Sequence, residues 1–188
     1  MSQISAAAEL AIGVGGSYTQ VGWDATSGSS SYAGAGALGD LRLGIPFKRS
    51  RASIEFFGSY SDQFLENTNH SLGETNRQTG IGGGMDFFYG PVFLGGQYES
   101  VTTKISGTNL SADLSYDAYG PRAGFRIRLK GRFSIMAGAL AEFGSLGVPV
   151  NGINQNRDVT EYRAFVLFRF NLFGAGKRSS SNASNSRY

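Results

Sequence analysis

The segment Arg163–Phe173, RAFVLFRFNLF, alternates between two kinds of side chain. One set of alternate positions is almost wholly apolar: Ala164, Val166, Phe168, Phe170 and Leu172. The other set carries two arginines: Arg163, Phe165, Leu167, Arg169 and Asn171. A period of two residues is typical of a β-strand with two different faces. The segment therefore predicts a strand with a row of large apolar groups on one side and arginines on the other.

The same alternation recurs in seven further segments, and no comparable segment has the periodicity of a helix. They cover residues 8–19, 40–47, 52–61, 78–89, 92–99, 119–129 and 133–143. Three connections between them are short, at residues 46–51, 89–91 and 129–132. The other four are long and polar, at residues 23–32, 65–77, 104–113 and 145–158. Short and long connections in turn describe an up-and-down meander, and eight strands can close on themselves without leaving an edge.

The sequence thus predicts an all-β chain that forms an eight-stranded antiparallel up-and-down transmembrane β-barrel. We expect the barrel to cover residues 8–173, after an N-terminal extension at 1–7 and before a flexible polar tail at 174–188. The first ten residues, MSQISAAAEL, contain no signal peptide, so we expect a mature form from which the signal has been removed.

Composition argues against several classes of function. The chain has no cysteine and a single histidine, His70, which makes a metal site improbable. Charged residues are 16% of the chain, too few for the dense cationic face of a nucleic-acid-binding protein. The glycines at 34, 36 and 39 fit a dinucleotide-binding pattern, but they lead into a strand and not a helix. We therefore expect no cofactor and no nucleic acid.

The polar positions within the strands hold small residues together with acids and arginines, while all four lysines lie at turns, at strand ends or in the tail. Opposite charges among small residues suit a narrow barrel lumen, where guanidinium groups pair with carboxylates. The predicted lumen charge network consists of Glu9, Asp40, Arg42, Glu55, Asp86, Glu99, Arg122, Arg126, Glu142, Glu161, Arg163 and Arg169. In a barrel of eight strands such pairs fill the interior.

The other face has no charge in its middle and is aromatic at both ends. Near the long connections we expect one girdle, formed by Tyr18, Trp23, Tyr60, Tyr98, Tyr119, Phe143 and Tyr162. Near the short turns we expect a second, formed by Phe47, Phe87, Tyr89, Phe133 and Phe170. Two girdles around an apolar band are what the lipid-facing surface of a barrel needs. A soluble lipocalin-like barrel also alternates, with its apolar face inward, and remains an alternative.

With these residues the chain resembles the small eight-stranded outer-membrane barrels of Gram-negative bacteria, such as the transmembrane domain of outer-membrane protein A or the outer-membrane protein X type. The resemblance spans about residues 8–173. In those families the last strand ends in an alternating apolar run that closes on an aromatic residue, and AFVLFRFNLF, residues 164–173, is similar. The resemblance implies a bacterial outer-membrane location, with membrane lipids or detergent as the surroundings.

A rigid barrel with four long polar loops predicts a non-enzymatic structural, adhesive or surface-recognition role, with an extracellular ligand at the loops. One alternative is a lipid-modifying barrel enzyme that uses His70 and Ser71; another is the soluble barrel carrying an apolar ligand. At the short turns, basic residues are placed to contact anionic lipid headgroups. They are Lys48, Arg49, Arg51, Lys130 and Arg132.

Overall fold

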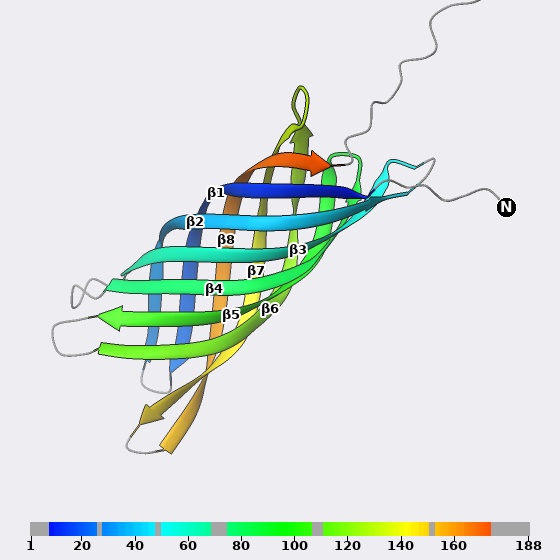
Figure 1. Ribbon diagram of the computed structural model, residues 1–188. Helices are drawn as coiled ribbons and strands as arrows, with labels where there is room; N and C mark the ends of the chain where they lie inside the picture. The colour runs from blue at the N-terminus through cyan, green and yellow to red at the C-terminus, as the bar shows by residue number, and fades with distance from the viewer. Residues whose placement is uncertain are drawn as a thin grey trace, which may run out of the picture.

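A computed structural model describes residues 8–25, 28–47, 50–68, 75–106, 111–150 and 153–173. They form eight strands: β1 (Glu9–Ala25), β2 (Gly28–Pro46), β3 (Ala52–Asn67), β4 (Thr75–Tyr89), β5 (Val92–Ser106), β6 (Ser111–Arg128), β7 (Phe133–Val150) and β8 (Ile153–Phe173). Each strand pairs antiparallel with its neighbours in sequence, and β8 pairs with β1 to close the barrel (Figure 1). The predicted eight-stranded antiparallel up-and-down barrel is therefore confirmed. The N-terminal extension at 1–7 and the tail at 174–188 lie outside the described residues.

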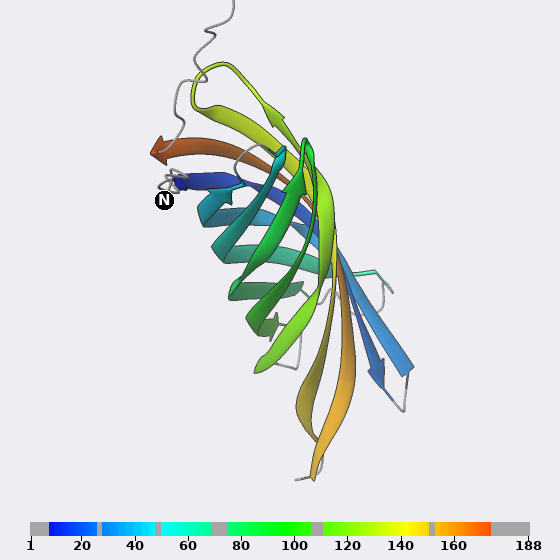
Figure 2. The same ribbon diagram turned by 90° about the vertical axis from the view of Figure 1, so that its right-hand side faces the viewer.

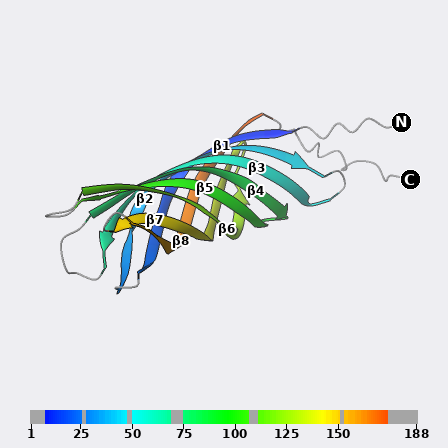
Figure 3. The ribbon, with the colours of Figure 1, turned by 90° about the horizontal axis from the view of Figure 1, so that it is seen from below.

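The start of β1 and the end of β8 meet at one end of the barrel (Figure 3). The register between these strands shifts by one residue there: Ala11 lies opposite Asn171, whereas Leu10 lies opposite Phe173. Leu172 has no partner on β1 in this register. The aromatic side chain of Phe173 therefore faces outward and is 70% exposed. The closing aromatic, out of phase in the sequence, is returned to the apolar face by the bulge.

Side chains alternate between the outside and the inside of the wall on every strand. Leu41, Ile81 and Phe168 lie on the exterior, and their large apolar neighbours along the strands lie there with them. Arg42 and Glu55 are buried inside. A continuous apolar exterior around a closed sheet, whose backbone hydrogen bonds are made between strands, is suited to hydrocarbon and not to water. The wall is that of a transmembrane barrel. No helix long and apolar enough to cross a bilayer occurs in the part of the chain that the structure describes.

We call the end with the β2–β3, β4–β5 and β6–β7 connections the turn end, and the opposite end the hairpin end. A strand needs about 9–11 residues to cross a bilayer. The strands here are longer, from 15 residues in β4 and β5 to 21 in β8. Since the turn end has only short connections, the additional residues of the strands lie at the hairpin end. They extend beyond the predicted aromatic girdle nearest to that end.

The expectation of four long loops is therefore wrong for most of these polar segments. Strand pairing runs through most of these polar segments, to Ala25 opposite Gly28 and Val150 opposite Ile153. Polar composition was interpreted as a loop signal, but outside the bilayer a two-stranded ribbon can be polar on both faces. The connections at the hairpin end are residues 26–27, 68–74, 107–110 and 151–152, most of which lie outside the described residues.

The barrel does not keep all its pairings at the hairpin end. The register of β6 with β7 ends where Asp117 lies opposite Ser145, although both strands continue beyond that point. From there β6 pairs only with β5, and β7 only with β8. The β7–β8 hairpin consequently leaves the barrel separately from the β5–β6 hairpin (Figures 1 and 2). The wall is split between β6 and β7 above the membrane band.

Candidate functional site

The structure places eleven of the twelve predicted lumen charges inside the barrel as buried side chains. The twelfth, Glu9, is half-buried at the start of β1. The buried set divides into two clusters along the barrel axis. The lower cluster, toward the turn end, contains Asp40, Arg42, Glu55, Asp86, Arg122, Arg126 and Arg169. The upper cluster, toward the hairpin end, contains Glu99, Glu142, Glu161 and Arg163.

Glu55 on β3 is the centre of the lower cluster. Its Oε1 accepts a short hydrogen bond from Nη1 of Arg126, and its Oε2 lies 3.0 Å from Nη2 of Arg169. Nη1 of Arg42 lies 3.4 Å from the same Oε2. The carboxylate of one residue is thus contacted by arginines from three other strands. Because removal of a buried charge leaves its partners uncompensated, we expect loss of the Glu55 carboxylate to destabilise the barrel.

Arg42 connects this centre to the other two acids. Its Nε lies 2.5 Å from Oδ2 of Asp40, and its Nη1 lies 2.6 Å from Oδ2 of Asp86. Asp86 is shared with Arg122, whose Nε is 3.2 Å from Oδ1. Four arginines therefore face three carboxylates in the lower cluster. It carries one more positive than negative charge.

Aromatic rings stack against these guanidinium groups inside the barrel. The Cζ atom of Arg122 lies 4.3 Å from the ring centroid of Phe57 and 4.8 Å from that of Phe165. Arg126 lies 4.0 Å from the ring centroid of Phe88. Rings of this kind favour a cation over their faces where water is excluded. The lumen holds its arginines by cation–π contacts as well as by ion pairs.

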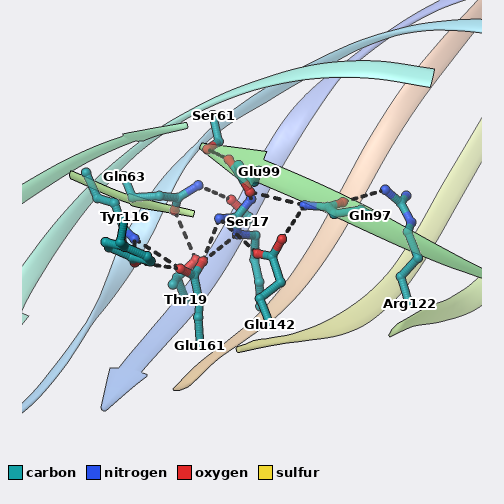
Figure 4. A network of polar contacts seen from close by, with 12 residues as sticks. Ser17, Thr19, Ser61, Gln63, Gln97, Glu99, Tyr116, Arg122, Glu142 and Glu161 are labelled. Carbon is teal, nitrogen blue, oxygen red and sulfur yellow. Dashed lines mark hydrogen bonds and ion pairs between the residues drawn. The ribbon is translucent and has the colours of Figure 1, made fainter. Parts of the chain in front are cut away.

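The upper cluster gathers three carboxylates around Arg163. Figure 4 labels these acids, Glu99, Glu142 and Glu161, together with the polar residues around them. Arg163 on β8 reaches Glu161 with Nη2 at 2.5 Å, Glu99 with Nη1 at 3.0 Å and Glu142 with Nη2 at 3.8 Å. Polar side chains complete the contacts: the hydroxyl of Ser61 donates to Glu99 at 2.5 Å. Gln97 Nε2 donates to both Glu99 and Glu142, at 3.1 and 3.0 Å. This cluster carries a surplus of negative charge.

Gln97 also joins the two clusters, because its Oε1 accepts a hydrogen bond of 2.9 Å from Nη1 of Arg122. Apolar side chains fill much of the interior beside and beyond the clusters. Toward the turn end and beside the arginines lie Leu38, Phe88, Phe93, Met136, Leu140, Phe165 and Leu167. Toward the hairpin end lie Val21, Trp23, Tyr32, Leu65, Val101, Tyr116, Ala118, Leu146 and Val159. The interior is packed with side chains along its length.

Eleven of the twelve predicted girdle residues lie on the exterior, at the two expected levels. The predicted position of Trp23 is wrong. This side chain is 7% exposed and packs inside the barrel against Tyr32, with ring centroids 5.1 Å apart. Strand β1 continues past Tyr18 without a break, and alternation places Trp23 on the inward side with Thr19 and Val21. The sequence prediction placed Trp23 at the start of a polar loop, where the alternation between inward and outward side chains was not applied.

The predicted lumen network contained only charged residues and left out the neutral polar side chains of the interior. Gln63 donates to the Ser17 hydroxyl at 2.7 Å, and Gln78 donates to Glu161 at 3.0 Å. Both glutamines are buried. Each glutamine is an even number of residues from a predicted lumen charge of its own strand. This spacing places it on the inner face and could have predicted it from the sequence. The histidine and serine at 70 and 71 lie outside the described residues. In the described part of the chain no group of His, Cys, Asp and Glu is suited to a metal ion.

A cleft of about 830 Å³ opens where β6 and β7 separate. Tyr119 and Phe143, which belong to the upper girdle, form its floor, and Ser115, Asp117, Asp158 and Thr160 line it above them. The residues that line the cleft, all within the described strands, include two aspartates and no lysine or arginine. It is an acidic cleft beside two strand edges that lack a partner.

Comparison with solved structures finds the same architecture at low identity. The crystal structure of Neisserial surface protein A is similar with a TM-score of 0.53 and 15% identity, over 85% of this chain and 96% of that chain. The solid-state NMR structure of outer membrane protein AlkL in lipid bilayers is similar with a TM-score of 0.52 and 9% identity, over 94% of this chain and 95% of that chain. No protein-family model and no curated protein matches the sequence. At these identities the likeness shows the barrel fold.

Proposed function

We propose that the chain is an integral protein of a bacterial outer membrane, without enzymatic activity, whose hairpin end recognises a partner at the cell surface. One observation carries the proposal: a lipid-suited exterior encloses a packed interior, while the strands continue well beyond the upper girdle as polar ribbons. The two structural neighbours, a surface protein and an outer membrane protein by their names, support the location. The packed interior supports a role at the surface over a role as an open pore.

The acidic cleft is the feature of the hairpin end best suited to recognition. The edges of β6 and β7 beside it present backbone N–H and C=O groups that no neighbouring strand satisfies. Such edges accept an extended peptide as an additional strand, and flanking side chains select its sequence. Asp117 and Asp158 select positive charge. The partner that fits is an extended segment with basic side chains.

The two alternative functions fare differently. A soluble barrel that carries an apolar ligand needs an apolar interior and a polar outer wall, whereas the large apolar rows lie outside and the charges inside. The lipid-modifying enzyme depends on His70 and Ser71, which lie outside the described residues, and no contact in the described strands favours it.

The orientation is tested by labelling single cysteines, since the natural chain contains none. Ser145→Cys places a thiol at the hairpin end and Lys130→Cys places one at the turn end. On intact cells that export the protein, a membrane-impermeant maleimide is expected to label position 145 and to reach position 130 only after the envelope is opened. Labelling of position 130 alone on intact cells would reverse the orientation, and a chain absent from the membrane fraction would exclude the proposal.

Recognition is tested with a synthetic peptide of alternating lysine and valine and the barrel in lipid nanodiscs. Asp117→Asn with Asp158→Asn is expected to weaken binding about tenfold or more, as befits charge-assisted contacts. The matched control is Asp62→Asn with Glu66→Gln, which removes two acids from β3 at the same end. If both double variants bind equally weakly, the attraction comes from overall charge and the cleft is not the binding site.

A further inference from the structure

At the turn end a second, smaller pocket of about 420 Å³ lies at the mouth of the lumen. Three arginines line it: Arg51 before β3, and Arg126 and Arg128 at the end of β6. Ser50 and Ser53 add hydroxyl groups. No acidic residue is among the lining residues, all of which the structure describes. The pocket has the size of a small-ligand site and a lining of one charge sign.

The pocket walls are fixed by backbone hydrogen bonds between turns. Gly90 N–H donates to the carbonyl of Arg51 at 3.0 Å, and Arg126 N–H donates to the carbonyl of Pro91 at 2.6 Å. Gly90 has a φ of 62°, a conformation that glycine adopts without strain. Arg51, the β4–β5 turn and the end of β6 are therefore joined in one hydrogen-bonded frame. The arginines project from that frame and not from a mobile loop.

The cations at this mouth have spare capacity for an anion. Neither Arg51 nor Arg128, both exposed, forms an ion pair within the described part of the chain. Beneath them, the lower cluster has one more arginine than carboxylates. Arg169 in that cluster is 3% exposed, and its Nε and Nη1 have no hydrogen-bond partner among the described residues. The positive charge at the pocket is therefore supplied chiefly by Arg51 and Arg128.

The pocket also lies at the level of the lower girdle. Phe87 and Tyr89, at the end of β4, are exposed on the outer wall immediately before the Gly90–Pro91 turn. Aromatic side chains of this kind mark the interface between lipid headgroups and water. A group held between Arg51 and Arg128 is thus at the depth of the lipid phosphates.

We propose that this pocket is a phosphate-binding site, in which the guanidinium groups of Arg51 and Arg128 hold one phosphate group. The planar forks of arginine match phosphate oxygens in pairs, and Arg126 supplies further positive charge from the wall. The phosphate comes either from an anionic phospholipid headgroup or from a free phosphate in the adjacent water. This inference does not depend on recognition at the hairpin end.

Two probes separate the sources. Binding of inorganic phosphate to the detergent-solubilised barrel is measured by calorimetry. Retention of phosphatidylglycerol is measured by native mass spectrometry after incubation with vesicles of phosphatidylcholine and phosphatidylglycerol. Arg51→Gln with Arg128→Gln is expected to lower the affinity about tenfold or more, because charged hydrogen bonds are lost.

The matched control is Lys104→Gln with Arg157→Gln, which removes two positive charges from β5 and β8 at the hairpin end, away from the pocket. Its effect is expected to stay below about threefold, since exposed charges at a distance are screened. Both double variants are first checked for a compact band that slows on boiling. If the pocket variant weakens binding of both probes, the site binds phosphate in general. If it weakens retention of the lipid alone, the site binds the lipid headgroup. Equal losses in the two double variants, or no binding of either probe by the natural chain, would overturn the proposal.

Discussion

Replacing Glu55 by Gln tests the interior most directly. The exchange keeps the shape of the side chain and removes the charge that Arg42, Arg126 and Arg169 share. Glu55 is 2% exposed, so water cannot take the place of the lost carboxylate. Four arginines would then face two carboxylates. Breaking a buried ion pair by removing one partner costs about 3–5 kcal/mol, and we expect the free energy of unfolding to fall by that amount.

The assay is urea unfolding of the barrel in lipid vesicles, followed by the fluorescence of Trp23 and by electrophoresis without boiling. Trp23 is the single tryptophan and lies in the apolar interior, so its emission reports the packing directly. With a denaturant slope of roughly 1–3 kcal/mol per molar urea, the midpoint is expected to fall by at least about 1 M. Asp62→Asn is the control, because it makes the same chemical change in an exposed pair with Arg77.

A second exchange decides whether charge is the cause. Arg169→Gln added to Glu55→Gln leaves three arginines and two carboxylates in the lower cluster, so the surplus is again one positive charge. We expect part of the lost stability to return. If Glu55→Gln shifts the midpoint no more than Asp62→Asn does, the ion pairs do not hold the strands together. If the double variant is as unstable as the sum of both single variants, the loss comes from packing and not from charge.

Three further outcomes are expected. Brominated acyl chains should leave the emission of Trp23 unquenched, whereas Tyr18→Trp in a Trp23→Phe background should be quenched, since Tyr18 is 58% exposed on the outer wall; quenching of Trp23 would return it to the girdle. Gly120→Ala should destabilise the barrel by about 1–3 kcal/mol in urea unfolding, because its Cβ would overlap the carbonyl of Ala141, while Gly96→Ala, 3.7 Å from the nearest carbonyl oxygen, should not. The hydrogen bond from Arg77 lowers the pKa of Asp62 at the hairpin end. The stability that this pair adds is therefore present above the ordinary aspartate pKa of about 3.9 and is lost as the pH falls through the lowered pKa. In an NMR titration Arg77→Gln should raise the pKa of Asp62, and an unchanged pKa contradicts the pairing.

The membrane-spanning part of the fold could be predicted from the sequence because the bilayer sorts side chains sharply. A row such as Val166, Phe168 and Phe170 must face hydrocarbon, and Arg163 and Arg169 must not. Every second residue therefore carries information on its side of the wall. The alternation in eight segments was sufficient for strand number, topology and the facing of each strand.

Beyond the upper girdle the same pattern is lost, because water lies on both sides of the ribbons. Val150 pairs with Ile153 at the end of a segment rich in asparagine and glycine, and this composition predicted a loop. The separation of β6 from β7 has no signal in the composition of either strand. The register would allow Tyr116 to lie opposite Leu146, but both side chains pack into the interior layer while the backbones diverge.

The partners within the lumen were also beyond the sequence, although the set of charges was not. Alternation places Arg42, Glu55 and Asp86 on the inner face of three strands, but it does not give their heights relative to one another. Those heights follow from the register, in which Glu55 lies opposite Asp86 and Arg42 opposite Phe57. Two acids in adjacent positions repel unless cations reach both of them. Arg42 reaches both, which explains why arginine, with its length and its several donors, stands there.

The division of charge along the axis has a consequence for both ends of the molecule. The lower cluster has a surplus arginine and the upper cluster surplus carboxylates, and the hydrogen bond from Arg122 to Gln97 joins them. Because the interior is packed and excludes water, these surpluses are screened less than surface charges would be. The surplus at each end has the same sign as the pocket or cleft beyond it: arginines line the turn-end pocket, and aspartates line the hairpin-end cleft. The turn end thus presents arginines to an anion and the hairpin end presents aspartates to a cation, which is the polarity that both proposed sites require.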